Sequence, residues 1–371
     1  METPCYVYDL QLLRRTLDAA AKASAAVQNA HIHYAMKANS NPVILREIAL
    51  AGFGVDCVSG GEIKLALECG FKAEGVEFAG VGKTDKEILF ALHAGIGCFN
   101  VEGTEELEVI SQLAAQEGLV ARIALRINPN VGAHTHANIT TGLAENKFGI
   151  NLENMEQAVQ KALSLPNIDF LGLHFHIGSQ ILDMTDFQAL CNRINELQDW
   201  FQHRGISLRS INVGGGLGID YIHPETHPVP DFKAYFDTFA HHLRLLPGQE
   251  FHCEPGRSLV GQCGSLMSRC TFVKKGSVKN FVILDAGMND LVRPAMYQAY
   301  HKIDNVSAPD GEQTLYDVVG PICESSDCFA KGIYLPKVSR GDIIAIRSAG
   351  AYGEAMASTY NTRALPSVRF E

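Results

Sequence analysis

The sequence has 371 residues, of which 46% are hydrophobic and 19% charged, so it can bury a sizeable core and is not a disordered chain. The length favours two domains, or one large barrel with an appendage. The formal net charge of −10, from 31 basic and 41 acidic residues, argues against a nucleic-acid binder, because such proteins neutralise phosphates with a basic surface.

The start of the chain and its cysteines bear on the compartment. The first ten residues, METPCYVYDL, lack a basic segment followed by an apolar run, so we expect no signal peptide. No apolar stretch approaches the roughly 20 residues that cross a bilayer. Ten cysteines are scattered without a CxxC pair. We therefore expect reduced thiols in a cytoplasmic protein, not a disulfide framework.

Eight short apolar runs are predicted to be β-strands, most of them followed by a helical pattern. Eight strand–helix units over this length fit a TIM-like (β/α)8 barrel, which typically takes about 250 residues. A doubly wound open sheet is the alternative that length leaves open. The predicted strands cover residues 31–36, 54–58, 75–79, 96–100, 122–128, 170–176, 210–214 and 250–254.

Local signals mark the ends of several predicted helices. Pro42 suits a first helical turn, and Gly70 suits a helix stop. Thr84 and Glu87 have the spacing of a capping box. The stretch 128–147 is long for a strand–helix loop, and long loops are often functional.

The pattern changes after the eighth strand. Strand-like runs dominate residues 257–371 and helical periodicity nearly vanishes. We predict an α/β fold in which residues 27–256 form the barrel and 257–371 form a mostly-β domain. The N-terminal residues 1–26, a strand-like CYVYDL and a helix at 10–26, are expected to join that β domain.

Ionisable residues and glycines gather where the predicted strands end, and this is where barrel enzymes place catalytic groups. Lys37 follows the first strand and Asp56 lies on the second. A lysine after a strand is commonly a surface residue. At a barrel mouth, however, partial desolvation lowers the pKa of the amine, which then forms a Schiff base with an aldehyde.

The glycine run 214–218 follows the seventh strand, where barrels often bind phosphate through backbone N–H groups. A tight turn is the alternative interpretation, and the spacing does not fit a Rossmann fingerprint. Arg257 and Ser179 are candidates for further contacts with an anion.

Glu254 ends the eighth strand. It is either a buried structural carboxylate or a partner for the ring nitrogen of a pyridine cofactor. A carboxylate beside that nitrogen keeps it protonated, and the protonated ring acts as an electron sink. His174 and His176 alternate on the sixth predicted strand and are expected to face one side. Such a pair also suggests a metal site, but an arginine is a poor neighbour for a divalent cation. The other HxH pairs, His31/His33 and His134/His136, are expected to be packing and loop residues, not ligands.

The β domain carries its own candidates. Arg293 and Tyr297 share a face if helical, and Arg293 can clamp a carboxylate. Cys323 lies in the turn CESSD, and such a cysteine is more often inert than reactive. Tyr352 follows a strand and can present its phenol.

The ordered set YAMKAN, GLHFHIGSQ, NVGGGLG, CEPGRSLV, GPICESSD and GAYGEAMAS resembles the fold-type III decarboxylases that use pyridoxal 5'-phosphate (PLP). The likeness runs from residue 4 to about residue 365. It implies the fold of alanine racemase and ornithine decarboxylase. Within this family, the motifs look like the branch that converts meso-2,6-diaminoheptanedioate into L-lysine and CO2, the last step of lysine biosynthesis by that route.

The resemblance implies a cofactor site in the barrel. Lys37 would form the Schiff base, Asp56 would lie near the cofactor, His176 would stack on its ring and Glu254 would pair with the ring nitrogen. The phosphate would be held by Ser179, Gly214, Gly215, Gly216, Gly256 and Arg257.

The resemblance also implies a substrate site and a homodimer with shared active sites. Arg293 and Tyr297 would bind the distal end of the amino-acid substrate, with Arg257 nearby, and Tyr352 would contact cofactor and substrate. Cys323 and Glu324 would come from the partner subunit. Lys37 and Cys323 are both candidates for the group that returns a proton to Cα.

Several relatives of this kind remain as alternatives. Decarboxylases of arginine, ornithine or carboxynorspermidine share the fold, but a substrate with only a distal amine leaves Arg293 unpaired. An alanine racemase has a tyrosine base where this chain has its CES and AGAY motifs. A noncatalytic PLP-binding protein lacks the β domain, and a pseudoenzyme would lose cofactor residues that are present here.

Overall fold

The computed structural model describes residues 2–132 and 147–371, so the predicted loop residues His134 and His136 lie outside the described part. The chain divides into two compact units. The barrel unit comprises Leu17–Gly218 and Asp231–Gly256, and the second unit comprises Met1–Thr16, Ile219–Pro230 and Arg257–Glu371. Helix α1 (Leu10–Ser24) contributes residues to both. No helix in the described residues is long and apolar enough to cross a membrane.

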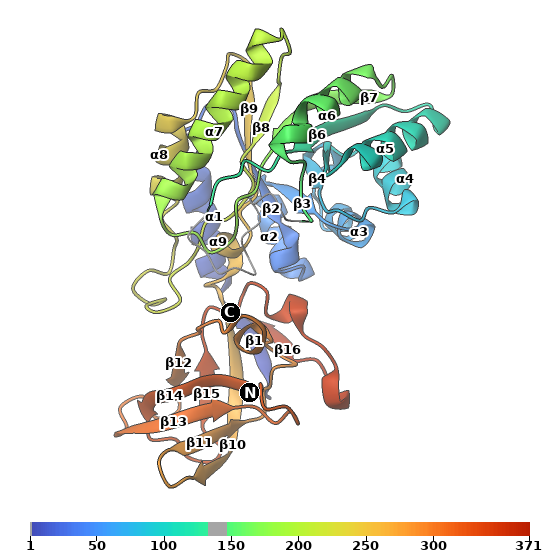
Figure 1. Cartoon of the computed structure of the whole chain (residues 1–371). Coiled ribbons are helices and arrows are strands. Elements are labelled where there is room, and N and C mark those ends of the chain that lie inside the picture. The colour runs from blue at the N-terminus through green and yellow to red at the C-terminus, as the bar shows by residue number, and fades with distance from the viewer. Residues whose placement is uncertain (1, 133–146) are drawn as a thin grey trace. The chain divides into compact units, whose positions relative to one another are not determined.

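The first unit is a closed barrel of eight parallel strands in chain order, which confirms the predicted fold class (Figure 1). The ring closes where β9 pairs with β2, with Ala30 opposite Phe251. The strands are β2 (Ala30–Ala35), β3 (Gly54–Cys57), β4 (Val76–Phe78), β5 (Cys98–Val101), β6 (Ala121–Arg126), β7 (Ile168–His174), β8 (Ser210–Asn212) and β9 (Glu250–Cys253).

Helices follow the strands and bear the predicted start and stop signals. Asn41 caps the helix that Pro42 begins. Thr84 and Glu87 form the expected capping box. Gly70 lies just past a helix end with φ +99°, a backbone conformation that favours glycine. The barrel helices are α2 (Pro42–Leu50), α3 (Gly60–Glu68), α4 (Asp85–Ala94), α5 (Thr104–Gln116), α6 (Leu152–Ser164), α7 (Met184–His203) and α8 (Phe232–His242).

Strands β7 and β8 end two residues earlier than predicted. β7 ends at His174 and β8 ends at Asn212, so the prediction that His174 and His176 share a strand is wrong. The two strands pair with each other as far as His174 and Asn212, and Gly214 then turns the chain away with φ +71°. His176 and the glycine run therefore lie in loops beyond the strand ends.

The interior of the barrel is unusually polar for this fold, in which branched apolar side chains usually fill the centre. Asn212 Nδ2 on β8 lies 2.6 Å from Glu77 Oε2 on β4. These strands are not neighbours in the ring, so both side chains point inward. Both are buried, and burial of such groups requires that they bond to one another.

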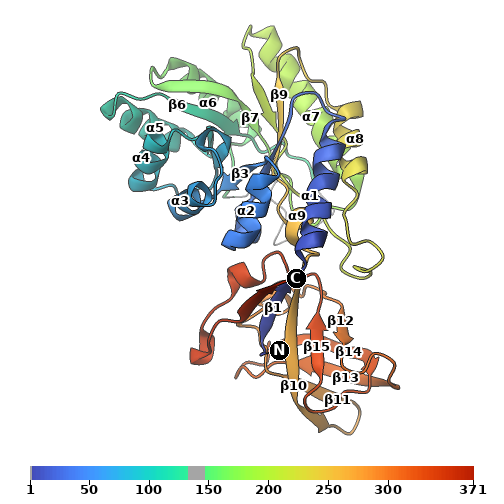
Figure 2. The ribbon, with the colours of Figure 1, turned by 180° about the vertical axis from the view of Figure 1, so that it is seen from behind.

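The second unit is built on one eight-stranded sheet with the path β12-β15-β10-β11-β13-β14. β1 (Cys5–Tyr8), from the N-terminus, pairs antiparallel with β10 and parallel with β16, and lies beside both in Figure 2. The remaining elements are β10 (Gly264–Lys275), β11 (Asn280–Leu284), β12 (Ile303–Asn305), β13 (Gln313–Val319), β14 (Cys328–Pro336), β15 (Ile343–Ile346), β16 (Ser367–Phe370), α9 (Arg257–Val260) and α10 (Arg293–Tyr297).

Candidate active site

Lys37 and Asp56 form an ion pair at the end of strands β2 and β3. Lys37 lies in a 3-10 turn, Met36–Ala38, that directly follows β2, and its Nζ is 2.8 Å from Asp56 Oδ2. The lysine side chain is 40% exposed, whereas the aspartate side chain is fully buried. The amine is therefore held by a buried carboxylate while it stays accessible to a small molecule.

Burial raises the pKa of Asp56 to about 7, and the neighbouring Lys37 opposes this rise. The second carboxylate oxygen, Oδ1, is buried and makes no hydrogen bond within the described residues. A buried oxygen without a donor is costly. Oδ1 is thus an acceptor for a donor that the described residues do not provide.

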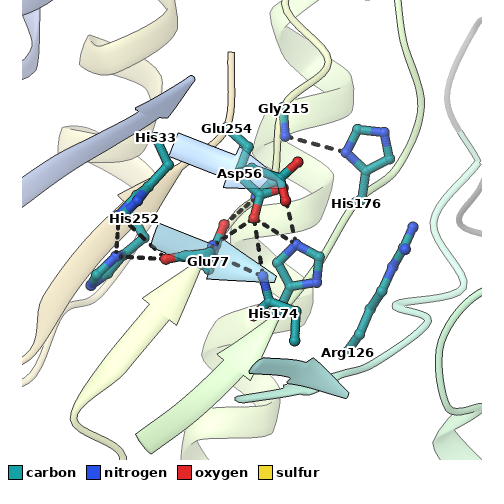
Figure 3. Close-up of polar contacts among 12 residues, drawn as sticks. His33, Asp56, Glu77, Arg126, His174, His176, Gly215, His252 and Glu254 are labelled. Carbon is teal, nitrogen blue, oxygen red and sulfur yellow. Dashed lines mark hydrogen bonds and ion pairs between the residues drawn. The ribbon is translucent and has the colours of Figure 1, made fainter. Parts of the chain in front are cut away.

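Glu254, directly after β9, is buried and held from three other strands (Figure 3). Its Oε1 accepts hydrogen bonds from Asn212 Nδ2 at 2.8 Å and from Asn100 Nδ2 at 3.3 Å. His174 Nε2 lies 3.1 Å from Oε2. These contacts fix the orientation of the carboxylate.

Asn100, Asn212 and the contact of His174 with Glu254 were missed by the sequence reasoning. His174 and Asn212 are the last residues of β7 and β8, and Asn100 is the last but one of β5. Their polar side chains point into the barrel. The sequence carried a signal, because Asn100 ends the apolar run IGCFN and Asn212 follows Ile211 in SINVG. A polar residue inside an apolar strand points to a bonded interior position.

The loop Gly214–Gly216 packs so tightly that side chains are excluded from it. A Cβ at Gly214 would lie 2.2 Å from Phe175 O, and one at Gly215 would lie 2.3 Å from Glu254 O. Gly216 has φ +118°. Glycine is therefore required at these positions to bring the backbone against the ends of β7 and β9, the kind of turn that lets N–H groups approach an anion.

His176 lies against this glycine loop. Gly215 N–H donates to His176 Nδ1 at 3.2 Å, so this ring nitrogen acts as the acceptor. Burial, followed by the positive charges of Arg126 and Lys37, lowers the pKa of His176 well below its usual value. The ring is therefore a neutral imidazole, and its Nδ1 accepts from the glycine loop (Figure 3).

Ser179 and Gly256 complete the predicted barrel set. Ser179 is half-buried and follows His176 in the loop after β7. Gly256 packs on the Lys37 turn, since a Cβ there would lie 3.1 Å from Ala35 Cβ and 3.2 Å from Ala38 Cβ. The structure thus brings Lys37, Asp56, His176, the glycine loop and Glu254 to the carboxyl ends of the barrel strands.

In the second unit, two buried arginines lie around Tyr221. Arg257 Nη1 donates to Tyr221 Oη at 2.6 Å, and the Arg293 guanidinium lies 5.0 Å from the centre of the same ring. Tyr352 stacks near Arg257, with 4.9 Å between the guanidinium carbon and the ring centre. Tyr297 is half-buried at the end of α10. Tyr221 itself was not predicted.

Arg293 makes no ion pair with a carboxylate within the described residues. Its Nη1 lies 2.7 Å from His301 Nε2, and burial lowers the pKa of Arg293. Burial also lowers the pKa of His301 to about 3, with Arg293 adding to the effect, so His301 is neutral and accepts from the guanidinium. A buried cation without a counter-ion favours the binding of an anion.

Cys323 and Glu324 lie in an exposed turn of the same unit. Asp327 orders this turn, because its Oδ2 accepts from Ile322 N–H at 2.7 Å and its Oδ1 accepts from Met288 N–H at 2.7 Å. Glu324 accepts from Tyr360 Oη at 3.0 Å. The turn is thus rigidly built although it presents its thiol and carboxylate outward.

The sequence was compared with family models and with known proteins. Residues 11–261 match the family described as pyridoxal-dependent decarboxylase, pyridoxal binding domain. The chain is 60% identical over 366 residues to the diaminopimelate decarboxylase of Bacteroides thetaiotaomicron, covering 99% of this chain and 95% of that protein.

Solved structures give the same result. The chain superposes on the Helicobacter pylori diaminopimelate decarboxylase complexed with L-lysine with a TM-score of 0.93 at 40% identity, covering 100% of this chain and 92% of the other. A lysine/ornithine decarboxylase from Vibrio vulnificus, complexed with putrescine, is 23% identical with a TM-score of 0.84, covering 100% and 94%, and shares the fold. This chain therefore belongs to the diaminopimelate decarboxylase family of pyridoxal-dependent decarboxylases.

Proposed function

We propose that the chain catalyses the PLP-dependent decarboxylation of meso-2,6-diaminoheptanedioate to L-lysine and CO2. The observation that carries this assignment is the likeness over nearly the whole chain to a diaminopimelate decarboxylase at 60% identity. Lysine is the product of that reaction, and the H. pylori relative has been solved in complex with L-lysine. The site geometry supports the same chemistry.

The barrel residues fit PLP. Asp56 Oδ1 is a buried acceptor that lacks a donor within the described residues, and the glycine loop forms a cradle that a Cβ would fill. Lys37 would bind the cofactor aldehyde, Asp56 would hold that amine, and His176 would support the ring. Ser179, Gly214, Gly215, Gly216, Gly256 and Arg257 would hold the phosphate.

PLP supplies an electron sink for the pair of electrons that the departing CO2 leaves behind. Glu254 would face the pyridine nitrogen and keep it protonated, because its carboxylate is held in place by Asn212, Asn100 and His174. Lys37, with its amine exposed and bonded to Asp56, or Cys323 returns a proton to Cα.

Arg293 supports a substrate with two carboxylates. One carboxylate is lost as CO2, and the other needs a cation at the distal end. Arg293 is buried, and its polar contact in the described residues is with neutral His301. Arg257 would lie near the substrate as well, with Tyr297, Glu324 and Tyr352 as further contacts.

We also propose that the enzyme works as a cytoplasmic homodimer with shared active sites. The exposed and rigid Cys323–Glu324 turn suits a group that is donated to a partner subunit. All ten cysteines are free thiols, and eight of them are buried, as expected where disulfides do not form.

A substrate panel tests the assignment. The purified enzyme is loaded with PLP and given meso-diaminoheptanedioate, ornithine, arginine or carboxynorspermidine, and CO2 and the amine product are measured. We expect release of CO2 and L-lysine from the first substrate alone. Preferential turnover of ornithine, arginine or carboxynorspermidine would instead assign the chain to another decarboxylase of this fold.

A further inference from the structure

A compact group of three side chains lies in the barrel on the amino-terminal side of Glu254. It comprises His33 on β2, Glu77 on β4 and His252 on β9, and we call it the His–Glu–His cluster. His33 Nε2 lies 2.9 Å from His252 Nδ1, and Glu77 Oε1 lies 3.3 Å and 3.1 Å from these two nitrogens. Three ligand atoms thus converge from three strands (Figure 3).

The outer nitrogens of both histidines are already engaged. His33 Nδ1 lies 3.2 Å from Gly75 O, and His252 Nε2 lies 3.3 Å from Glu250 Oε2. Carbonyl and carboxylate oxygens accept, so these ring nitrogens carry the protons. The inner nitrogens, His33 Nε2 and His252 Nδ1, then face each other with Glu77 Oε1 beside both. A proton bridges this pair in the metal-free chain, and a divalent ion would take its place.

Glu77 is oriented in the same way from outside the cluster. Its Oε2 accepts from Asn212 Nδ2 at 2.6 Å and from Asn100 Nδ2 at 3.0 Å, which leaves Oε1 turned toward the histidines. Backbone or carboxylate partners for the far nitrogen of each histidine, and hydrogen bonds to the far carboxylate oxygen, are the outer contacts that hold metal ligands in place.

The distances suit a tetrahedral ion. Zinc binds histidine nitrogen and carboxylate oxygen at about 2.0–2.2 Å, which separates neighbouring ligand atoms by roughly 3.3–3.5 Å. The three distances in the cluster, 2.9, 3.1 and 3.3 Å, lie close to that separation. Two histidines and one glutamate leave a fourth position for water, as in zinc sites with three protein ligands.

An entry path exists at the amino ends of the strands. A cavity of about 330 Å³ is lined by all three cluster residues and by Gly97 and Gly248, which precede β5 and β9. The His252 side chain remains 15% exposed. An ion can therefore reach the cluster without passing the site that contains Lys37.

The charges around the cavity are mixed. Glu74 and Glu250 line it and favour a cation. Arg122 and Arg209 line it too, but Arg122 Nη2 donates to Ile96 O at 2.9 Å and Arg209 pairs with Asp169. Both guanidinium groups are thus directed to other partners.

We propose that the His–Glu–His cluster binds one divalent transition-metal ion, with Zn²⁺ the best match. The ion would join β2 and β9, the two strands whose pairing closes the ring, to β4 across the barrel. Its role would be to fasten the barrel, since the cluster lies outside the group of residues around Lys37. This proposal gives His33 a ligand role in place of the packing role that its sequence context suggests.

Equilibrium dialysis tests the proposal. The PLP-loaded protein is dialysed against EDTA, then against ZnCl₂, then against metal-free buffer, and its zinc is measured by mass spectrometry. We expect one retained zinc per chain in the wild type. His252→Gln and Glu77→Gln should lose it, and Glu250→Gln should bind zinc about 10- to 100-fold more weakly, because it removes an outer contact.

His227→Gln is the matched control. His227 is exposed, and its Nδ1 lies 2.8 Å from Asp220 Oδ2. The variant therefore tests whether zinc binds to a surface histidine and carboxylate instead. We expect it to retain as much zinc as the wild type. The wild type should also melt at a higher temperature with zinc than after EDTA, since an ion that binds the folded state alone stabilises it. A wild type that retains no zinc, or the same zinc content in all variants, would overturn the proposal even if one variant fails to fold.

Discussion

Asn212 connects the Glu254 carboxylate to the glycine loop. Its Nδ2 donates to Glu254 Oε1 at 2.8 Å, while its Oδ1 accepts from Gly214 N–H at 2.8 Å. One amide therefore fixes both the group proposed to face the ring nitrogen and the loop proposed to hold the phosphate.

We predict that Asn212→Ala lowers kcat about 10- to 100-fold, because a hydrogen bond to a charged group contributes about 1.5–3 kcal/mol. Glu254 would retain the longer contact with Asn100. Steady-state kinetics and the PLP content of the purified variant give the measurement. Asn195→Ala is the control, because Asn195 is half-buried on α7 and bonds to His242 O away from Glu254 and the glycine loop. Equal kcat values for the two variants would contradict the prediction.

Arg293→Ala is predicted to abolish most diaminoheptanedioate turnover while PLP binding is retained. Loss of one member of a buried charge pair typically costs about 2–5 kcal/mol, so kcat/KM should fall by more than about 30-fold. The control is Arg340→Ala, because Arg340 lies over the exposed ring of Phe272 at 5.6 Å. Retention of wild-type kcat/KM in Arg293→Ala would remove this residue from the substrate site.

His301 is predicted to make the protein acid-sensitive. Its pKa is about 3 in the folded chain and 6.5 otherwise, so between these values the unfolded chain binds one more proton. Stability is complete above pH 6.5 and falls as the pH drops toward 3, by up to about 1.4 kcal/mol per pH unit from this group.

The thermal midpoint at pH 7.5 and 5.0 measures this effect. His301→Gln keeps an acceptor for Arg293 but does not titrate, so its midpoint should fall less than that of the wild type. His203→Gln replaces an exposed histidine at the end of α7 and should behave as the wild type does. An identical fall in all three proteins would speak against the assignment.

Shared active sites predict complementation between inactive chains. Lys37→Ala and Cys323→Ala, mixed under conditions that allow subunit exchange, should recover up to about one quarter of wild-type activity. Half of randomly formed dimers are mixed, and each of these has one intact site. The readout is lysine formation after mixing. Exchange that is shown by mass labelling but gives no activity would place Cys323 outside the partner's site.

Much of the barrel site was predictable because catalytic groups of this fold follow strand ends. Lys37, Glu254 and the glycine run each directly follow an apolar run in the sequence, and the structure places them at the carboxyl ends of the strands. The boundaries of the eight strands were predicted to within two residues, and β7, which ends at His174, shows this largest difference of two residues at its end.

The contacts across the barrel were not predictable. Asn100, Asn212 and Glu77 are separated by up to 135 residues in the chain, and no local pattern says which inward polar groups will meet. His33 looked like a packing residue because only the closed ring brings it to His252. Tyr221 and His301 were missed for the same reason, since their meeting with Arg257 and Arg293 depends on the fold of the second unit.

The polar interior of the barrel has a consequence for how this unit opens. If one strand separates, the amides and carboxylates on the opposite strands lose their partners while they are still buried, which is costly for each group. Partial opening is therefore penalised at several places at once. Amide hydrogen exchange in β4, β5, β8 and β9 should consequently show one shared opening free energy, with no strand that exchanges early by itself.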